Sequence, residues 1–229
     1  MRERSTTALL LLLMVILVIP ACVRRDQPCR FMQVPCMFEA PPFKLTVVDA
    51  GTGQPLADVH ALAEWQMVGA NGRPDGPLMA LDAVSDSDGV VTFPGWGPIQ
   101  GPATGIDIGR DPFITLFKTG YRAFLVNNQY DPPGEEQERV RRSAHDGVTY
   151  AMEPFHGAPE QWLEQLGRVA FGIAVPRSGE ETHTFRSVYL NRLNRISAEG
   201  NKFTAKEHAP GGFFWHVDRE LTRLQGREQ

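Results

Sequence analysis

Hydrophobic and polar positions alternate in short runs through residues 43–155, with the two-residue period of β-strands. In the clearest run, Val59, Ala61, Ala63 and Trp65 alternate with His60, Leu62 and Glu64. Runs of similar length, rich in β-branched or aromatic residues, occupy 43–49, 79–84, 90–93, 113–118, 122–126 and 148–152. Strands at this spacing, with no helical pattern between them, predict an antiparallel β-sandwich.

Turn signals separate these runs. Residues 51–56 contain Gly and Pro, and Asp88-Gly89 supplies the positive φ that tight hairpins need. We expect that hairpin to return 90–93 along 79–84. Gly120 predicts a further turn that places Tyr121 against the sheet. Residues 94–112 form a long insert rich in Gly and Pro.

The period changes to that of helices in residues 156–229. Trp162, Leu166 and Val169 recur at helical spacing after Pro159, which favours a helix start. Two further stripes, with that spacing, consist of Phe185, Val188, Tyr189, Arg192, Leu193 and Ile196, and of Phe213, Phe214, Val217, Leu221 and Leu224. Either three short helices pack on the edge of the sandwich, or their aromatic residues line a groove for a partner.

The N-terminus has the order of an export signal. Arg2 and Arg4 precede twelve uncharged apolar residues, 8–19, which are too few to span a bilayer permanently. The stretch Ile19-Pro20-Ala21-Cys22 resembles the lipobox of bacterial lipoproteins. That resemblance implies a signal peptide over 1–21, lipid on Cys22 and, because Val23 follows, sorting to the outer membrane. We expect the protein to face the periplasm there. An ordinary secretory signal is the alternative.

The segment 22–42 is irregular, polar and proline-containing, and it reads as a tether. If Cys22 is acylated, Cys29 and Cys36 remain, and in an oxidising compartment they would form one disulfide; free thiols are the alternative. Removing 1–21 takes away two arginines and one glutamate, so the formal charge changes from −4 to −5. This charge does not favour nucleic acid as a partner.

The turn motifs carry a family resemblance. Residues 45–49, 52–59, 87–93 and 118–121 resemble, in order and spacing, carboxypeptidase regulatory-like domains. The resemblance covers about half of the mature chain and implies a transthyretin-like β-sandwich, which we place at 43–155. The helical pattern defines a separate C-terminal region over 156–229. The insert between Gly89 and Gly120 is a departure from the family pattern. The family implies no catalytic residues here.

No residue pattern diagnostic of catalysis or metal binding stands out. The six histidines lack the spacing of a zinc site, and Asp82, Asp86 and Asp88 lack the rest of a calcium loop. Ser143 and His145 are close in sequence, but an activated serine needs a geometry that sequence does not specify. We therefore expect no metal, no cofactor and no enzymatic activity. The alternative is a metal-dependent or serine hydrolase with its site in the C-terminal region.

Aromatic residues near predicted loops favour recognition instead. Trp96 lies in the insert, and Phe213, Phe214 and Trp215 lie near the C-terminus. Exposed aromatic side chains bury apolar area when a partner docks. The sequence therefore predicts a membrane-anchored envelope lipoprotein that is a binding or structural module. Its docking face would include these four residues and would contact an envelope protein or polymer.

Overall fold

The computed structural model describes residues 37–69, 74–101, 106–108, 112–126, 140–171 and 185–226. All of them belong to one compact unit, residues 35–229. In this part of the chain no helix is long and apolar enough to cross a membrane. The signal peptide, Cys22, Cys29 and Cys36 lie outside the described residues, so those predictions stay predictions.

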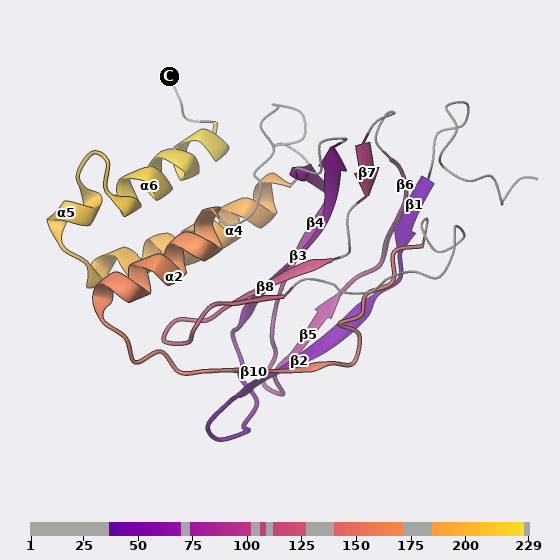
Figure 1. Ribbon diagram of the computed structural model, residues 1–229, viewed down its shortest axis with the longest axis horizontal. Helices are drawn as coiled ribbons and strands as arrows, with labels where there is room; N and C mark the ends of the chain where they lie inside the picture. Colours follow the sequence, from indigo (N-terminus) through magenta and orange to yellow (C-terminus); the bar gives the residue numbers. More distant parts are fainter. Residues whose placement is uncertain are drawn as a thin grey trace, which may run out of the picture. The chain divides into compact units, whose positions relative to one another are not determined.

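The described part of the chain is mainly β, and the predicted fold class is confirmed (Figure 1). Its first strands are β1 (Met37–Ala40), β2 (Phe43–Asp49), β3 (His60–Gly69), β4 (Pro74–Val84) and β5 (Val90–Phe93). Then follow β6 (Trp96–Gln100), β7 (Ile106–Ile108), β8 (Phe113–Phe117), β9 (Phe124–Val126) and β10 (Thr149–Met152). The helices are α2 (Pro159–Phe171), α4 (Arg186–Ser197), the 3₁₀ helix η3 (Ala198–Lys202), α5 (Ala205–His208) and α6 (Phe213–Leu224).

Three sheets form the sandwich. One has the order β10-β2-β5, a second has the order β4-β3-β8-β9 with β7 also paired to β3, and β1 pairs with β6. One pairing differs from a simple hairpin arrangement. β10 runs parallel to β2, whereas the other strand pairs are antiparallel. β1 lies within the segment that was predicted to be a tether.

The predicted pairing of 90–93 with 79–84 is wrong. β5 pairs instead with β2, where Leu45 lies opposite Val91, so the Asp88-Gly89 turn carries the chain from one sheet to the other. Side chains explain the crossing. The Ser85 hydroxyl accepts from the Val59 N–H (2.8 Å) and donates to the Leu56 carbonyl (2.7 Å) where β4 ends. Sequence period predicts that a strand exists, but it does not specify which neighbour the strand pairs with.

β3 lies in the middle layer and is buried on both faces. Its odd-numbered residues Ala61, Ala63 and Trp65 belong to the core between the sheets, where Trp65 meets Phe43 edge-on (6.3 Å between centroids). Its even-numbered residue Leu62 belongs to the core beneath the helices. Because both faces of β3 are buried, its residues alternate between these two cores, and not between a buried face and an exposed face.

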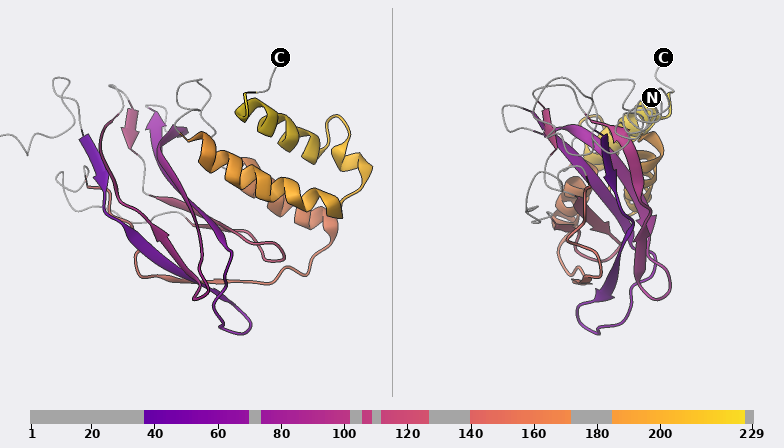
Figure 2. Two further views of the ribbon diagram at one scale, coloured as in Figure 1. Left: turned by 180° about the vertical axis from the view of Figure 1, so that it is seen from behind. Right: turned by 90° about the vertical axis from the view of Figure 1, so that its right-hand side faces the viewer.

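The helices cover the outer face of the β4-β3-β8-β9 sheet. Leu62, Ala80 and Phe117 of the sheet pack in one core with the apolar stripes of α2, α4 and α6. The three predicted stripes are confirmed, and the helices pack on the face of a sheet instead of its edge. Figures 1 and 2 show them beside one another, away from the end of the sheets where β1 and β6 lie. We call α2, α4, η3, α5 and α6 the helical layer.

Candidate functional site

A pocket of about 350 Å³ lies where β1 ends and β6 begins. The backbone N–H of Arg141 donates to the Glu39 carbonyl (2.7 Å), and Val140 bridges to Glu39, so residues 140–142 run beside β1. The pocket is lined by Glu39, Ala40, Pro41, Gly95, Trp96, Gly97, Val140 and Arg142. Its lining therefore combines a carboxylate, a guanidinium and an indole, which is a mixed set suited to a polar ligand with some apolar surface.

Glycine at position 97 permits the close approach of β6 to β1. Gly97 has φ +101°, and a Cβ there would lie 2.6 Å from the Glu39 Cα. Only glycine adopts this backbone at such close range without displacing its neighbour. The position of this pocket wall therefore depends on a glycine in the segment that the sequence predicted to be a Gly- and Pro-rich insert.

Trp96 is less exposed than the docking prediction assumed. Its side chain is 9% exposed, and its ring meets the Trp65 ring edge-on, with centroids 5.3 Å apart. Its indole N–H has no hydrogen-bond partner among the described residues. The expectation of an exposed Trp96 in a loop is corrected: the ring belongs to the core and forms part of the pocket wall from within β6.

The other three docking residues lie on α6. Phe214 is 1% exposed and stacks on His208, whereas Phe213 and Trp215 are half-buried. The Arg219 guanidinium lies 4.7 Å from the centroid of the Trp215 ring. β6 and α6 lie at opposite ends of the described unit (Figures 1 and 2), so Trp96 and the α6 aromatics do not form one continuous face. Whether either group docks a partner stays a prediction.

A buried polar cluster lies between the sheet and the helical layer. We call Glu64 of β3, Thr115 of β8, and Tyr189 and Arg192 of α4 the polar core; each is at most 1% exposed. The Tyr189 hydroxyl donates to Glu64 Oε1 (3.1 Å), and the Arg192 guanidinium lies 5.0 Å from the centroid of the Tyr189 ring. Glu64 Oε2, Thr115 Oγ1 and all three guanidinium nitrogens have no hydrogen-bond partner among the described residues.

Burial dominates the electrostatics of the polar core. It raises the pKa of Glu64 to about 7, although the positive charge of Arg192 and the hydrogen bond from Tyr189 act in the opposite direction. Burial also lowers the pKa of Arg192, against the attraction of Glu64. Two ionisable groups held in an apolar interface without full pairing are costly, and such costs are often linked to function.

The sequence analysis missed this cluster although both charged residues stood in apolar patterns. Glu64 lies inside the alternating run of β3, and Arg192 lies inside the apolar stripe of α4. The sequence did contain a signal for this cluster, because a charged residue stood at a position where the pattern predicts burial. It did not identify the partner, because β3 and α4 are more than a hundred residues apart.

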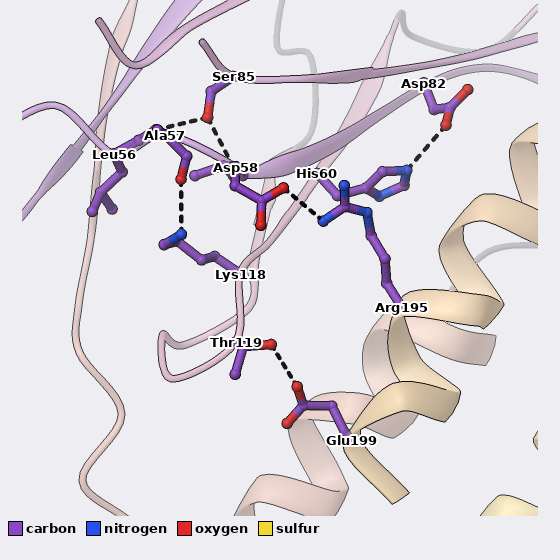
Figure 3. Close-up of polar contacts among 11 residues, drawn as sticks. Leu56, Ala57, Asp58, His60, Asp82, Ser85, Lys118, Thr119, Arg195 and Glu199 are labelled. Atoms are coloured by element: carbon purple, nitrogen blue, oxygen red, sulfur yellow. Dashed lines mark hydrogen bonds and ion pairs between the residues drawn. The ribbon is translucent and has the colours of Figure 1, made fainter. Parts of the chain in front are cut away.

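Polar contacts at the other end of α4 hold the helical layer to the sandwich (Figure 3). Arg195 reaches Asp58 (3.1 Å), and the buried Glu199 accepts a hydrogen bond from Thr119 Oγ1 (2.5 Å). The second oxygen of Glu199 accepts from the Trp162 indole (3.0 Å) and from Lys202 (2.7 Å). Because every one of these partners is satisfied, this region is best explained as a structural connection.

A third polar group joins β3, β4 and α4. His60 Nε2 lies 3.2 Å from Asp82 Oδ2, and the Asn191 side chain donates to the same oxygen (3.0 Å). Burial raises the pKa of Asp82, but these two hydrogen bonds outweigh it and leave the pKa below its usual value. His60 is almost fully buried, so this group also serves the sheet–helix interface.

Two of the residues considered for catalysis or metal binding, His145 and Asp86, have other partners in the described part of the chain. The His145 ring bonds the Tyr150 hydroxyl (2.6 Å) and the Pro112 carbonyl (3.1 Å), so it is not paired with the Ser143 hydroxyl. Asp86 Oδ1 accepts from the backbone of Asp88 and Val90, which closes the turn. His183 lies outside the described residues. Within the described ranges, no group of three or more potential metal ligands lies together.

Similarity to known proteins is limited to the fold. No protein-family model matches the chain, and no curated protein matches its sequence. A 3-chlorocatechol 1,2-dioxygenase from Rhodococcus opacus 1CP is 14% identical (TM-score 0.33) over 55% of this chain and 63% of its own. An intradiol ring-cleavage dioxygenase from Tetranychus urticae is 15% identical (TM-score 0.32) over 56% and 85%. A mutant form of the shaft pilin SpaA from Lactobacillus rhamnosus GG is 12% identical (TM-score 0.27) over 54% and 48%.

These likenesses are weak and transfer no activity, but they correct one prediction. Four of the matched structures are dioxygenases, at 13–15% identity and TM-scores of 0.30–0.33. The prediction that the chain is not an enzyme is therefore contradicted. It rested on the absence of sequence motifs in a sandwich fold, and fold does not exclude catalysis. The comparisons give only a weak fold link to solved structures that include dioxygenases and a pilin shaft protein.

Proposed function

We propose that this chain is a lipid-anchored protein of the bacterial cell envelope whose β-sandwich, of the carboxypeptidase regulatory-like type, binds an envelope protein or polymer. The observation that carries the proposal is the pocket between β1 and β6, with Glu39, Trp96 and Arg142 in its lining. A concave site with a few charged groups beside an aromatic wall is the usual form of a recognition site. The N-terminal pattern around Cys22 supports the anchor.

The pocket is tested by a change of charge at its rim. Arg142 is exposed, so Arg142→Glu should leave the fold intact while it reverses the sign of one pocket wall. We expect cross-links formed in cells from a photoreactive group at position 39 to fall at least fivefold. Arg122 is an exposed arginine outside the pocket, paired with Glu153 at 3.5 Å, and Arg122→Glu is the matched control. An unchanged set of cross-linked partners in Arg142→Glu would remove the pocket from consideration.

The anchor is tested at Cys22. A cysteine that carries a diacylglyceryl group and an amide-linked acyl chain would bury many methylene groups, each contributing about 0.8 kcal/mol, so the attachment would be effectively permanent. Cys22→Ser should abolish incorporation of labelled palmitate, and the protein should leave the membrane fraction, whereas Cys29→Ser should retain both. Palmitate labelling of the Cys22→Ser protein, or its sedimentation with membranes after a high-salt wash, would show that lipid on Cys22 does not hold it.

A further inference from the structure

The unpartnered polar atoms of the polar core are not explained by the proposed binding at the pocket. Glu64 of β3 and Arg192 of α4 attract each other electrostatically, but among the described residues no ion pair or hydrogen bond joins them, and Glu64 is fully buried. A buried ion pair retained for stability would have good geometry and filled hydrogen bonds. Here one carboxylate oxygen and the whole guanidinium are left without a partner.

We propose that Glu64 takes up a proton inside the folded protein, and that loss of this proton loosens the helical layer from the sheet. With its proton, the Glu64 side chain is a neutral group hydrogen-bonded to Tyr189. Without it, a full negative charge lies in an interface closed to water, and its nearest cation is held over the Tyr189 ring. Separation of α4 from β3 would restore water to the carboxylate, so ionisation favours the open arrangement.

The sign and the pH range follow from the same environment. A carboxyl group with a pKa of about 7 when buried, against 4.5 when exposed, stabilises the closed layer most at acidic pH. This contribution decreases as the pH rises from about 4.5 and is gone above about 7. The opening equilibrium of the helical layer should therefore increase by roughly 10- to 100-fold between pH 5 and pH 8.

The pH dependence caused by Glu64 must be distinguished from that of other ionisable groups on the surrounding elements. α4 contributes Tyr189 and Arg192, and α6 contributes Glu220, which is paired with Arg223 at 2.6 Å. β3 and β4 contribute His60 and Asp82, 3.2 Å apart. On β8 the residues opposite β3 in this region are Phe113, Thr115 and Phe117, which do not titrate. His60 is the one histidine in this set, so a variant without it is included as a control.

Amide hydrogen exchange on the full chain tests the proposal. Protection factors of α4 and α6 should fall at least tenfold between pH 5 and pH 8, while those of β2 and β5 change much less. Glu64→Gln keeps an oxygen acceptor for Tyr189 but does not titrate, so it should abolish the difference. His60→Gln should preserve it. Equal changes in the helices and in β2 and β5, or a difference lost only in His60→Gln, would overturn the proposal.

If Glu64→Gln folds poorly, the proposal can still be tested by titrating Glu64 directly in the unmodified protein. The carboxyl carbon resonance of Glu64 in the unmodified protein should shift with a midpoint near pH 7. Arg192→Met removes the cation that favours the ionised form, so it should move that midpoint to higher pH. A midpoint below pH 5 in the unmodified protein would show that Glu64 is an ordinary solvated carboxylate, and the proposal would fail.

Discussion

Replacing Gly89 with valine should lower the free energy of unfolding by about 3 kcal/mol or more, through backbone strain together with a steric clash. Gly89 has φ +74°, a conformation that β-branched residues strongly resist. A Cβ at this position would lie 2.4 Å from the Val47 carbonyl oxygen, in the backbone of β2. The shift in urea midpoint, with the slope of the transition unchanged, measures the effect.

Gly53→Val is the matched control for Gly89→Val. Gly53 also has a positive φ, +69°, but nothing lies within 4 Å of a Cβ built there. The control therefore shows the conformational cost alone, and we expect it to be clearly smaller than the effect at Gly89. Equal losses at the two positions would mean that contact with β2 does not contribute, and an unchanged midpoint for Gly89→Val would contradict the positive φ itself.

Truncating Trp65 to alanine should cost about 3–5 kcal/mol. Trp65 is the largest of the fully buried side chains, and it contacts rings on both sides of the sandwich core, Phe43 and Trp96. Removing it leaves a cavity that strands paired on both sides of β3 cannot close. Thermal and chemical unfolding, followed by circular dichroism, would measure the loss.

Trp65→Phe separates ring packing from simple loss of volume. The indole N–H of Trp65 has no partner among the described residues, so phenylalanine loses no hydrogen bond there and should cost markedly less than alanine. A cost as large for phenylalanine as for alanine would show that the indole N–H contributes through an interaction that these contacts do not include. Because Trp96 rests on Trp65, the alanine variant should also weaken binding at the pocket.

Much of the architecture could be predicted from local pattern. The alternation around Val59–Trp65 and the three helical stripes predicted a strand and the helices, because the two faces of an element have different surroundings and this imposes a period on the sequence. Gly89 was predicted to need a positive φ, which it has. Such features depend on residues that are close in sequence.

The candidate sites could be predicted only in part. Trp96 was singled out and does line a pocket, but its burial against Trp65 was not foreseen, since exposure depends on residues thirty positions away. Arg142, which also lines this pocket, was not singled out from the sequence. The pairing of β5 with β2 was also missed, because turn chemistry specifies a reversal of the chain and leaves the choice of neighbouring strand to the packing of the sheets.

By itself the sequence determined the elements and their amphipathic faces, since these follow from side-chain period and backbone preference within a few residues. Only the tertiary structure decided that the outer face of β3 would be covered by α4, which turned Glu64 and Arg192 from ordinary charged residues into a buried polar core. The physical reason is desolvation. The energy of a charge depends on all the groups that exclude water from it, and those groups come from distant parts of the chain.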